Sequence, residues 1–187
     1  MHPVLQQVHE SYRAQLAARP TEWCQLHPYQ DERLWNAQNL IEHLVLTCRS
    51  SSRVLEKRLE RDRPAAGHSS PVQWLLQMMI LSFGHMPRGS PAPIFARPHQ
   101  LRWPPMNGTE LSDLLRQELD RMDSLIDRSR KRFGLQRVAI HFLLGPLRPD
   151  QWRRFHVIHM RHHLDQLHRI EKSVGRPIAF EDSSAPV

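Results

Sequence analysis

Apolar residues recur every three or four positions in four long stretches of the chain, which is the spacing of an amphipathic helix. The pattern predicts helices over residues 3–18, 31–62, 110–133 and 149–174. Pro20 follows the first stretch, Thr109 is the expected N-cap of the third, and Gly175 is a natural C-cap for the last. The second stretch carries apolar residues at heptad spacing from Leu34 to Leu55. Four long helices are therefore expected to share one apolar core.

The segments between these stretches predict shorter elements. Ser69-Ser70-Pro71 is typical of an N-cap followed by proline, and it predicts a short helix whose Trp74 packs in the core. Six prolines in the nineteen residues 87–105 exclude helix or central strand and predict a long ordered crossover. Residues 134–148, which include His141, are expected to form a loop.

Period-two runs of β-branched and aromatic residues, the usual mark of strands, are missing from the sequence. The expected fold class is therefore all-α: a four-helix bundle with one extra short helix and the proline-rich crossover. A chain of 187 residues suits one domain, here residues 1–187, with 176–187 as a loose tail.

Composition bears on the cellular location of the protein and on the ligand atoms that a metal could have. The mean hydropathy is −0.57. No apolar run approaches the ~20 residues of a membrane span, and the first residues lack a signal-peptide layout, so we expect a cytoplasmic protein without a membrane partner. Cys24 and Cys48 are the two cysteines and form no CxxC motif. A disulfide framework or a thiolate zinc site is not indicated, and any metal should have nitrogen or oxygen ligands.

The net charge of +7 would suit a nucleic-acid binder, but its distribution does not. The arginines are spread along the chain, and the densest run, Arg128 to Arg132, falls at a predicted helix end, where cations stabilise the helix dipole. Nucleic-acid binding would require Arg128, Arg130, Arg132 and Arg137 to share a face with other arginines. A nucleic-acid partner is not expected, and a small-molecule substrate is favoured.

Histidine is concentrated near the end of the chain: five fall within the thirteen residues 156–168. At about 100° per residue, His156, His159, His162 and His163 share an arc with apolar residues, whereas His168 points away. An apolar core avoids polar groups that lack partners, so a bound divalent metal is the simplest explanation of this face.

The spacing favours one mononuclear site. His159 and His163 are four residues apart, which places their Cβ atoms about 5–6 Å apart on one helix face, within reach of a single ion. Met160 follows the first histidine, so the HExxH metalloprotease motif is absent. A third ligand must come from another helix, and His43 is the best choice because it lies in the most apolar part of its stretch.

Residues 35–44 (WNAQNLIEHL) and 159–166 (HMRHHLDQ) resemble the motifs of the DinB/YfiT-like superfamily, and residues 141–152 (HFLLGPLRPDQW) resemble an uncharacterised bacterial branch of it. The resemblance implies a four-helix bundle in which His43, His159 and His163 bind a divalent cation, commonly nickel or zinc. Some relatives transfer or use low-molecular-weight thiols such as bacillithiol or mycothiol, and others are thiol-dependent isomerases. Related bundles often pair, so a homodimer is allowed.

Five further residues are candidates around the metal. His162 and His156 are expected to line the cleft or to contact the ligands. His141 either reaches the pocket or caps a turn. Asn39 and Gln166 either orient ligand imidazoles through their second nitrogen or are surface amides. Because spacing reveals no carboxylate partner, no catalytic base is assigned.

Two functions remain open at this point. The first is a metal-dependent hydrolase or low-molecular-weight-thiol transferase, in which an open coordination position activates water or a thiol. The second is a non-catalytic helical module with a structural or sensing metal. An open coordination position would favour the enzyme, and a fourth protein ligand would favour the module.

Overall fold

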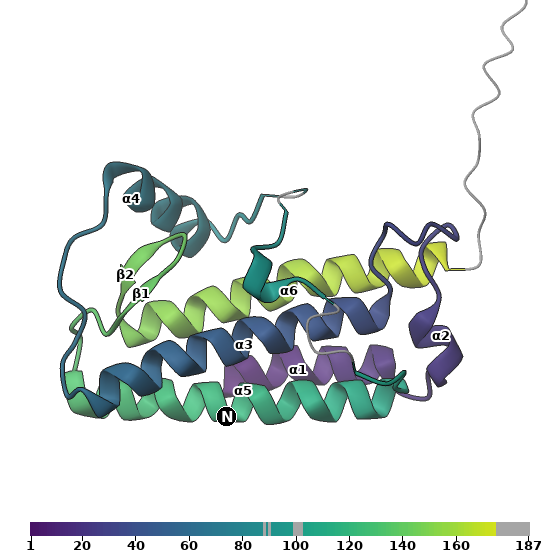
Figure 1. Ribbon diagram of the computed structural model, residues 1–187, viewed down its shortest axis with the longest axis horizontal. Coiled ribbons are helices and arrows are strands. Elements are labelled where there is room, and N and C mark those ends of the chain that lie inside the picture. Colours follow the sequence, from purple (N-terminus) through teal and green to yellow (C-terminus); the bar gives the residue numbers. More distant parts are fainter. Residues whose placement is uncertain (88, 90, 99–102, 175–187) are drawn as a thin grey trace, which may run out of the picture.

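The computed structural model describes residues 1–87, 89, 91–98 and 103–174, and this part of the chain is mostly helical. Four long helices lie side by side along its longest axis (Figure 1): α1 (Pro3–Leu16), α3 (Ala37–Glu60), α5 (Gly108–Phe133) and α6 (Pro149–Ser173). No helix in the described ranges is long and apolar enough to cross a membrane. The predicted tail 176–187 and the Gly175 cap lie outside these ranges.

The shorter elements connect the long helices. They are α2 (Thr21–Gln25), α4 (Pro71–Gln77), the π-helical turn η1 (Met78–Ser82), the 3-10 turn η2 (Ile94–Ala96) and the strands β1 (Ala139–His141) and β2 (Gly145–Leu147). Helix α4 begins after an N-cap at Ser70, as predicted. The turn η2 lies within the proline-rich crossover.

Asparagine caps set the start of two long helices, and both differ from the sequence prediction. Helix α3 was predicted to begin at Asp31 but begins six residues later, at Ala37. Asn36 and Asn39 form a reciprocal capping box that sets this start. Helix α5 begins after Asn107, whose side-chain oxygen accepts the backbone N–H of Glu110. The prediction that Thr109 caps this helix was wrong. In both cases the side-chain oxygen of an asparagine accepts a backbone N–H of the first helical turn, which has no acceptor within the helix.

The core lies between the four long helices and follows their predicted apolar faces. Ile41, Leu115 and Met122 are fully buried, and the buried Tyr12 hydroxyl donates to the Met160 carbonyl at 2.6 Å, which ties α1 to α6. Two residues of the predicted stripes are exposed: Val4 of α1, at 38%, and Leu34, which precedes α3, at 41%. The heptad pattern therefore extends one turn too far toward the N-terminus.

Residues 139–147 form an antiparallel hairpin in place of the expected loop, with His141 opposite Gly145. Strands of three residues are too short to produce a period-two pattern, so hydrophobic periodicity could not predict them. Helix α4 lies beside this hairpin, away from the long helices (Figure 1), and contains no buried residue. The prediction that Trp74 packs in the core was wrong, because its side chain is 59% exposed.

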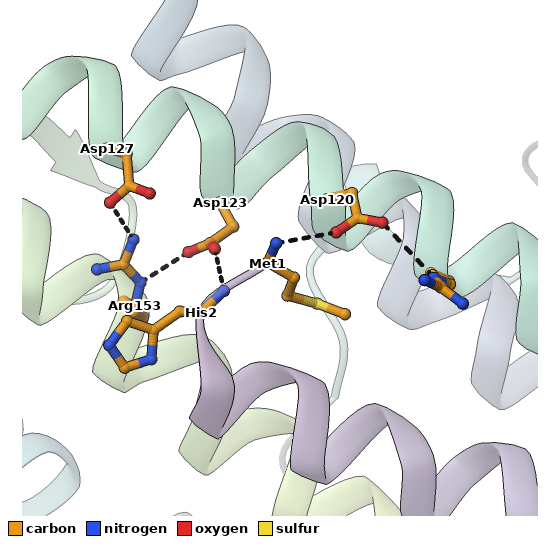
Figure 2. Close-up of polar contacts among 7 residues, drawn as sticks. Met1, His2, Asp120, Asp123, Asp127 and Arg153 are labelled. Atoms are coloured by element: carbon orange, nitrogen blue, oxygen red, sulfur yellow. Dashed lines mark hydrogen bonds and ion pairs between the residues drawn. The ribbon is translucent and has the colours of Figure 1, made fainter.

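A partly buried ion-pair network joins α6 to α5. Arg153 Nε donates to Asp123 Oδ1 at 2.7 Å, and its Nη2 donates to Asp127 Oδ1 at 2.6 Å (Figure 2). Asp123 also accepts the backbone N–H of His2 at 2.6 Å, so the same carboxylate holds the start of α1. The Asp123 side chain is 2% exposed, so these donors replace the water that its carboxylate loses on burial.

Removing the guanidinium should therefore be costly. We expect Arg153→Met to lower the free energy of unfolding by about 3 kcal/mol, because it leaves a buried carboxylate with one fewer donor. Urea denaturation at pH 7 measures this loss. Arg121→Met is the matched control on α5, since the Arg121–Glu56 pair is largely exposed and should contribute little. Equal losses in the two variants would contradict this account of the network.

Candidate metal centre

Three buried imidazoles meet between α3 and α6. His43 comes from the first third of α3, and His159 and His163 come from successive turns of α6. His43 Nε2 lies 3.2 Å from His159 Nε2, which lies 3.1 Å from His163 Nε2. Ligand atoms of all three residues lie within 4.8 Å of one another. The predicted pair and the predicted third histidine are thus brought together at one point.

Hydrogen bonds on the far side of two rings fix which nitrogen faces the centre. His43 Nδ1 lies 2.7 Å from the Ala96 carbonyl oxygen, and His163 Nδ1 lies 2.9 Å from Gln166 Oε1. Both partners are acceptors, so each Nδ1 carries the proton and donates. In a neutral imidazole the other nitrogen, Nε2, then presents a lone pair. Two lone pairs therefore point into the space beside His159.

Burial keeps these rings neutral. It is the largest cause that lowers the pKa of His43, of His159 and of His163, and the pKa of His163 falls to about 3. A neutral His159 can offer one Nε2 proton at most, which cannot satisfy both facing lone pairs, and its Nδ1 has no hydrogen-bond partner in the described part of the chain. Three facing nitrogens without enough protons are well suited to a cation.

The spacing fits such an ion. Metal–nitrogen bonds of 2.0–2.1 Å in tetrahedral geometry separate two ligand nitrogens by about 3.3 Å. The two Nε2 separations here are 3.2 and 3.1 Å. The three histidines could therefore hold a divalent metal ion with small side-chain adjustments.

Aromatic side chains hold the rings in these orientations. Trp35 lies over His43, with ring centroids 5.0 Å apart, and is close to parallel with the ring of His163. Phe155 stacks on His159 with an interplanar angle of 12° and a centroid distance of 5.4 Å. The sequence favoured core packing for Trp35, but the structure places it half-buried just before α3, against the histidine cluster.

The cluster opens onto a cavity of about 800 Å³, whose lining includes His43, His159 and His163. Its other walls come from α4, η1, the proline-rich crossover and the hairpin turn. This size is typical of sites for small molecules. The three nitrogens are thus buried from bulk solvent yet accessible from a cavity.

The other predicted site residues divide into two groups. His162 and Gln166 line the cavity, and of the two roles left open for Gln166 the structure shows the one that orients His163. His156 is buried but lies outside the cavity lining, where its Nε2 contacts Ser51 Oγ at 2.9 Å. Asn39 does not orient a ligand, because its side chain belongs to the capping box of α3. His168 is exposed, as predicted.

The Ala96 carbonyl was missed by sequence reasoning and has the orienting role that was one of the two alternatives for Asn39. Every residue offers a carbonyl, so no side-chain pattern could have marked this one. The proline density of residues 87–105 was the one available signal, since it predicted an ordered segment in place of a mobile loop.

His141 caps a turn and does not reach the cavity. Its Nδ1 accepts the backbone N–H groups of Leu143 and Leu144, each at 3.2 Å, and so closes the hairpin. Its ring packs on Phe155 with centroids 4.4 Å apart. Of the two roles proposed for this residue, the structural one is observed.

These features define a mostly helical protein with a buried three-histidine cluster that could hold a metal ion. The chain belongs to the family described as "Protein of unknown function (DUF1569)", whose profile matches residues 15–170 and so includes the whole cluster. Comparison with curated proteins and with solved structures found no significant match.

The buried His141 should make the protein sensitive to acid. Burial lowers its pKa to about 3, against an ordinary value near 6.5, so below pH 6.5 the unfolded chain binds a proton that the folded chain does not. The contribution of neutral His141 to the free energy of unfolding is therefore fully present above pH 6.5 and is lost as the pH drops toward 3. Between pH 7 and pH 5 this one residue should remove about 2 kcal/mol from the free energy of unfolding.

His141→Asn tests this contribution, because its amide oxygen can replace Nδ1 as acceptor for the two N–H groups but does not titrate. Urea denaturation at pH 7 and pH 5 should show that the variant loses about 2 kcal/mol less than the wild type. Other titrating groups are common to both proteins and cancel in the difference. Identical pH dependences would show that His141 is not held neutral by burial.

Proposed function

We propose that the chain is a metal-dependent enzyme of the DinB-like kind, built on a four-helix bundle of α1, α3, α5 and α6. In this proposal His43, His159 and His163 hold one divalent cation. The observation that carries it is the convergence of three buried Nε2 atoms on the edge of a large cavity. The element order supports the DinB resemblance, since His43 lies on the second long helix and the other two histidines lie on the last.

The donor set favours zinc or nickel. Three imidazole nitrogens suit borderline metals, whereas magnesium and calcium prefer oxygen ligands. Both cysteines are fully buried in the apolar core, and burial raises the pKa of Cys24 to about 11, so neither offers a thiolate to the site.

Three neutral ligands leave the full positive charge of the cation at the centre. When bound there, a metal would supply Lewis acidity, which can lower the pKa of a coordinated water from 15.7 to about 7 or favour a thiolate. The protein supplies orientation and shielding: Ala96 and Gln166 fix two rings, and Trp35 and Phe155 cover the imidazole faces. We infer a hydrolase or a transferase of a low-molecular-weight thiol.

A non-catalytic module with a structural or sensing metal is the second candidate. Structural zinc sites use four protein ligands and are closed, whereas catalytic sites use three and keep an open position. Within the described ranges the cluster has three members, and all three line the cavity. This arrangement favours the enzyme.

Metal retention tests the site itself. We expect His159→Ala and His163→Ala to lose at least ~90% of the metal that the wild-type protein retains, because each removes one of three ligands. Elemental analysis of protein purified under identical conditions measures metal per chain. His168→Ala is the control, as it removes an exposed imidazole from the same helix. Wild-type content in all three variants would exclude the proposed site.

Catalysis separates the two candidates. The metal-loaded protein should hydrolyse activated esters, or transfer a low-molecular-weight thiol to an electrophilic acceptor, at a rate that chelation and His163→Ala both reduce at least ~100-fold. Turnover in a spectrophotometric screen measures this. If the metal raises the melting temperature while no reaction depends on it, the structural module is the correct alternative.

A further inference from the structure

The cavity beside the histidines is elongated along α6. Phe155, His159, His163, Gln166 and Arg169 all line it, and their spacing of three or four residues places them on one helix face. At 1.5 Å per residue, the backbone rises about 21 Å from Phe155 to Arg169. The histidine cluster lies between these two ends, so a ligand in the cavity can extend from it in both directions.

The end near Phe155 is apolar. The hairpin turn contributes Phe142, and the segment formed by α4 and η1 contributes Leu76 and Ile80. Phe142 contacts Phe95 of the crossover edge-to-face, with ring centroids 5.3 Å apart. Both phenylalanines are substantially exposed, at 55% and 43%, although they line a cavity. Such walls gain free energy by covering an apolar group of a ligand.

The opposite end is cationic. A bridge between Pro28 and Val174 holds the segment before α3 against the end of α6, so Arg33 and Arg169 both belong to this part of the cavity wall. Arg33 is neutralised by a two-pronged pair with Asp31, whose Oδ2 lies 2.9 Å from Nη2. The guanidinium of Arg169 forms no hydrogen bond or ion pair within the described part of the chain.

Asp31, which pairs with Arg33, lies outside the described cavity lining, and no carboxylate of that lining balances the charge of Arg169. The described residues of its lining include two arginines and four histidines but no aspartate or glutamate. A divalent cation on the cluster would add to the positive potential. Charge complementarity therefore calls for an anionic ligand, and the unpaired fork of Arg169 matches a carboxylate or phosphate.

We propose that the cavity binds an anionic amphiphile: a small molecule whose apolar body lies at the Phe142 end and whose anionic group is bound by Arg169. This inference rests on the proposed function, because it takes the cavity beside the metal site as the substrate site. The bond to be broken or formed lies between the two groups, next to the histidines. Arg169 determines specificity in this scheme and positions the substrate.

N-octanoylglycine is a suitable probe, since an apolar chain and a carboxylate flank its central amide. Two analogues remove one feature each: N-octanoylglycinamide lacks the charge, and N-acetylglycine lacks the apolar chain. Isothermal titration calorimetry at pH 7, with metal-loaded and with chelated protein, should give a Kd for N-octanoylglycine at least ~10-fold below that of either analogue. Equal affinities for the acid and its amide in the chelated protein would overturn the proposal.

Matched variants test which residue binds each end of the ligand. Arg169→Gln should raise the Kd of the acid at least ~10-fold and leave that of the amide unchanged, whereas Arg161→Gln, an exposed arginine of α6 outside this cavity, should change neither. Phe142→Ala should weaken acid and amide alike, and Ile140→Ala, an exposed residue of the same hairpin outside the cavity, should not. An unchanged acid affinity in Arg169→Gln overturns the assignment of the anion site.

Metal content separates this inference from the proposed function. The wild type could prefer the acid over the amide only when it is metal-loaded, and Arg169→Gln could retain that preference. The carboxylate then binds the metal, and the role assigned to Arg169 is wrong. If the wild type retains no metal but the chelated protein shows the pattern expected for Arg169 and Phe142, the proposed function fails and the amphiphile site stands.

Discussion

Burial of three uncharged imidazoles at one point is the constraint on which the rest of the site depends. A polar nitrogen removed from water must find a partner, or the fold loses the free energy of its hydration. Here the outer nitrogens of His43 and His163 find a carbonyl and an amide oxygen. Their inner nitrogens face His159, which has too few protons for both. A cation would resolve this conflict, and the surrounding rings keep the three donors in place.

The proline-rich crossover shows how one irregular segment can serve this constraint twice. Its 3-10 turn provides the Ala96 carbonyl that orients His43, and the preceding residue, Phe95, forms part of the cavity wall. Proline restricts the backbone, so a segment without regular helix or strand can still hold a carbonyl at a fixed position. The geometry of the cluster therefore depends on a connection between helices as well as on the helices that carry the histidines.

Helical periodicity predicted the long helices and most of their buried faces, since a repeat of 3.6 residues over twenty or more positions is a strong signal. The same rule found His159 and His163, and the apolar surroundings of His43 indicated the third member. Features with only local signals were missed: the asparagine caps, the three-residue strands and the Ala96 carbonyl. The prediction for Trp74 was wrong because an apolar periodic pattern does not distinguish a helix in the core from one that covers a cavity or lies on the surface.

The bond between His43 and Ala96 has a consequence for how this site can vary. Its acceptor belongs to the main chain, so exchanging the side chain at position 96 leaves the oxygen in place, whereas inserting or deleting a residue nearby would displace it. Tolerance to mutation around the crossover should thus depend more on the length and backbone path of the segment than on the identity of its side chains. A histidine held through a side-chain amide, as His163 is by Gln166, has the opposite sensitivity.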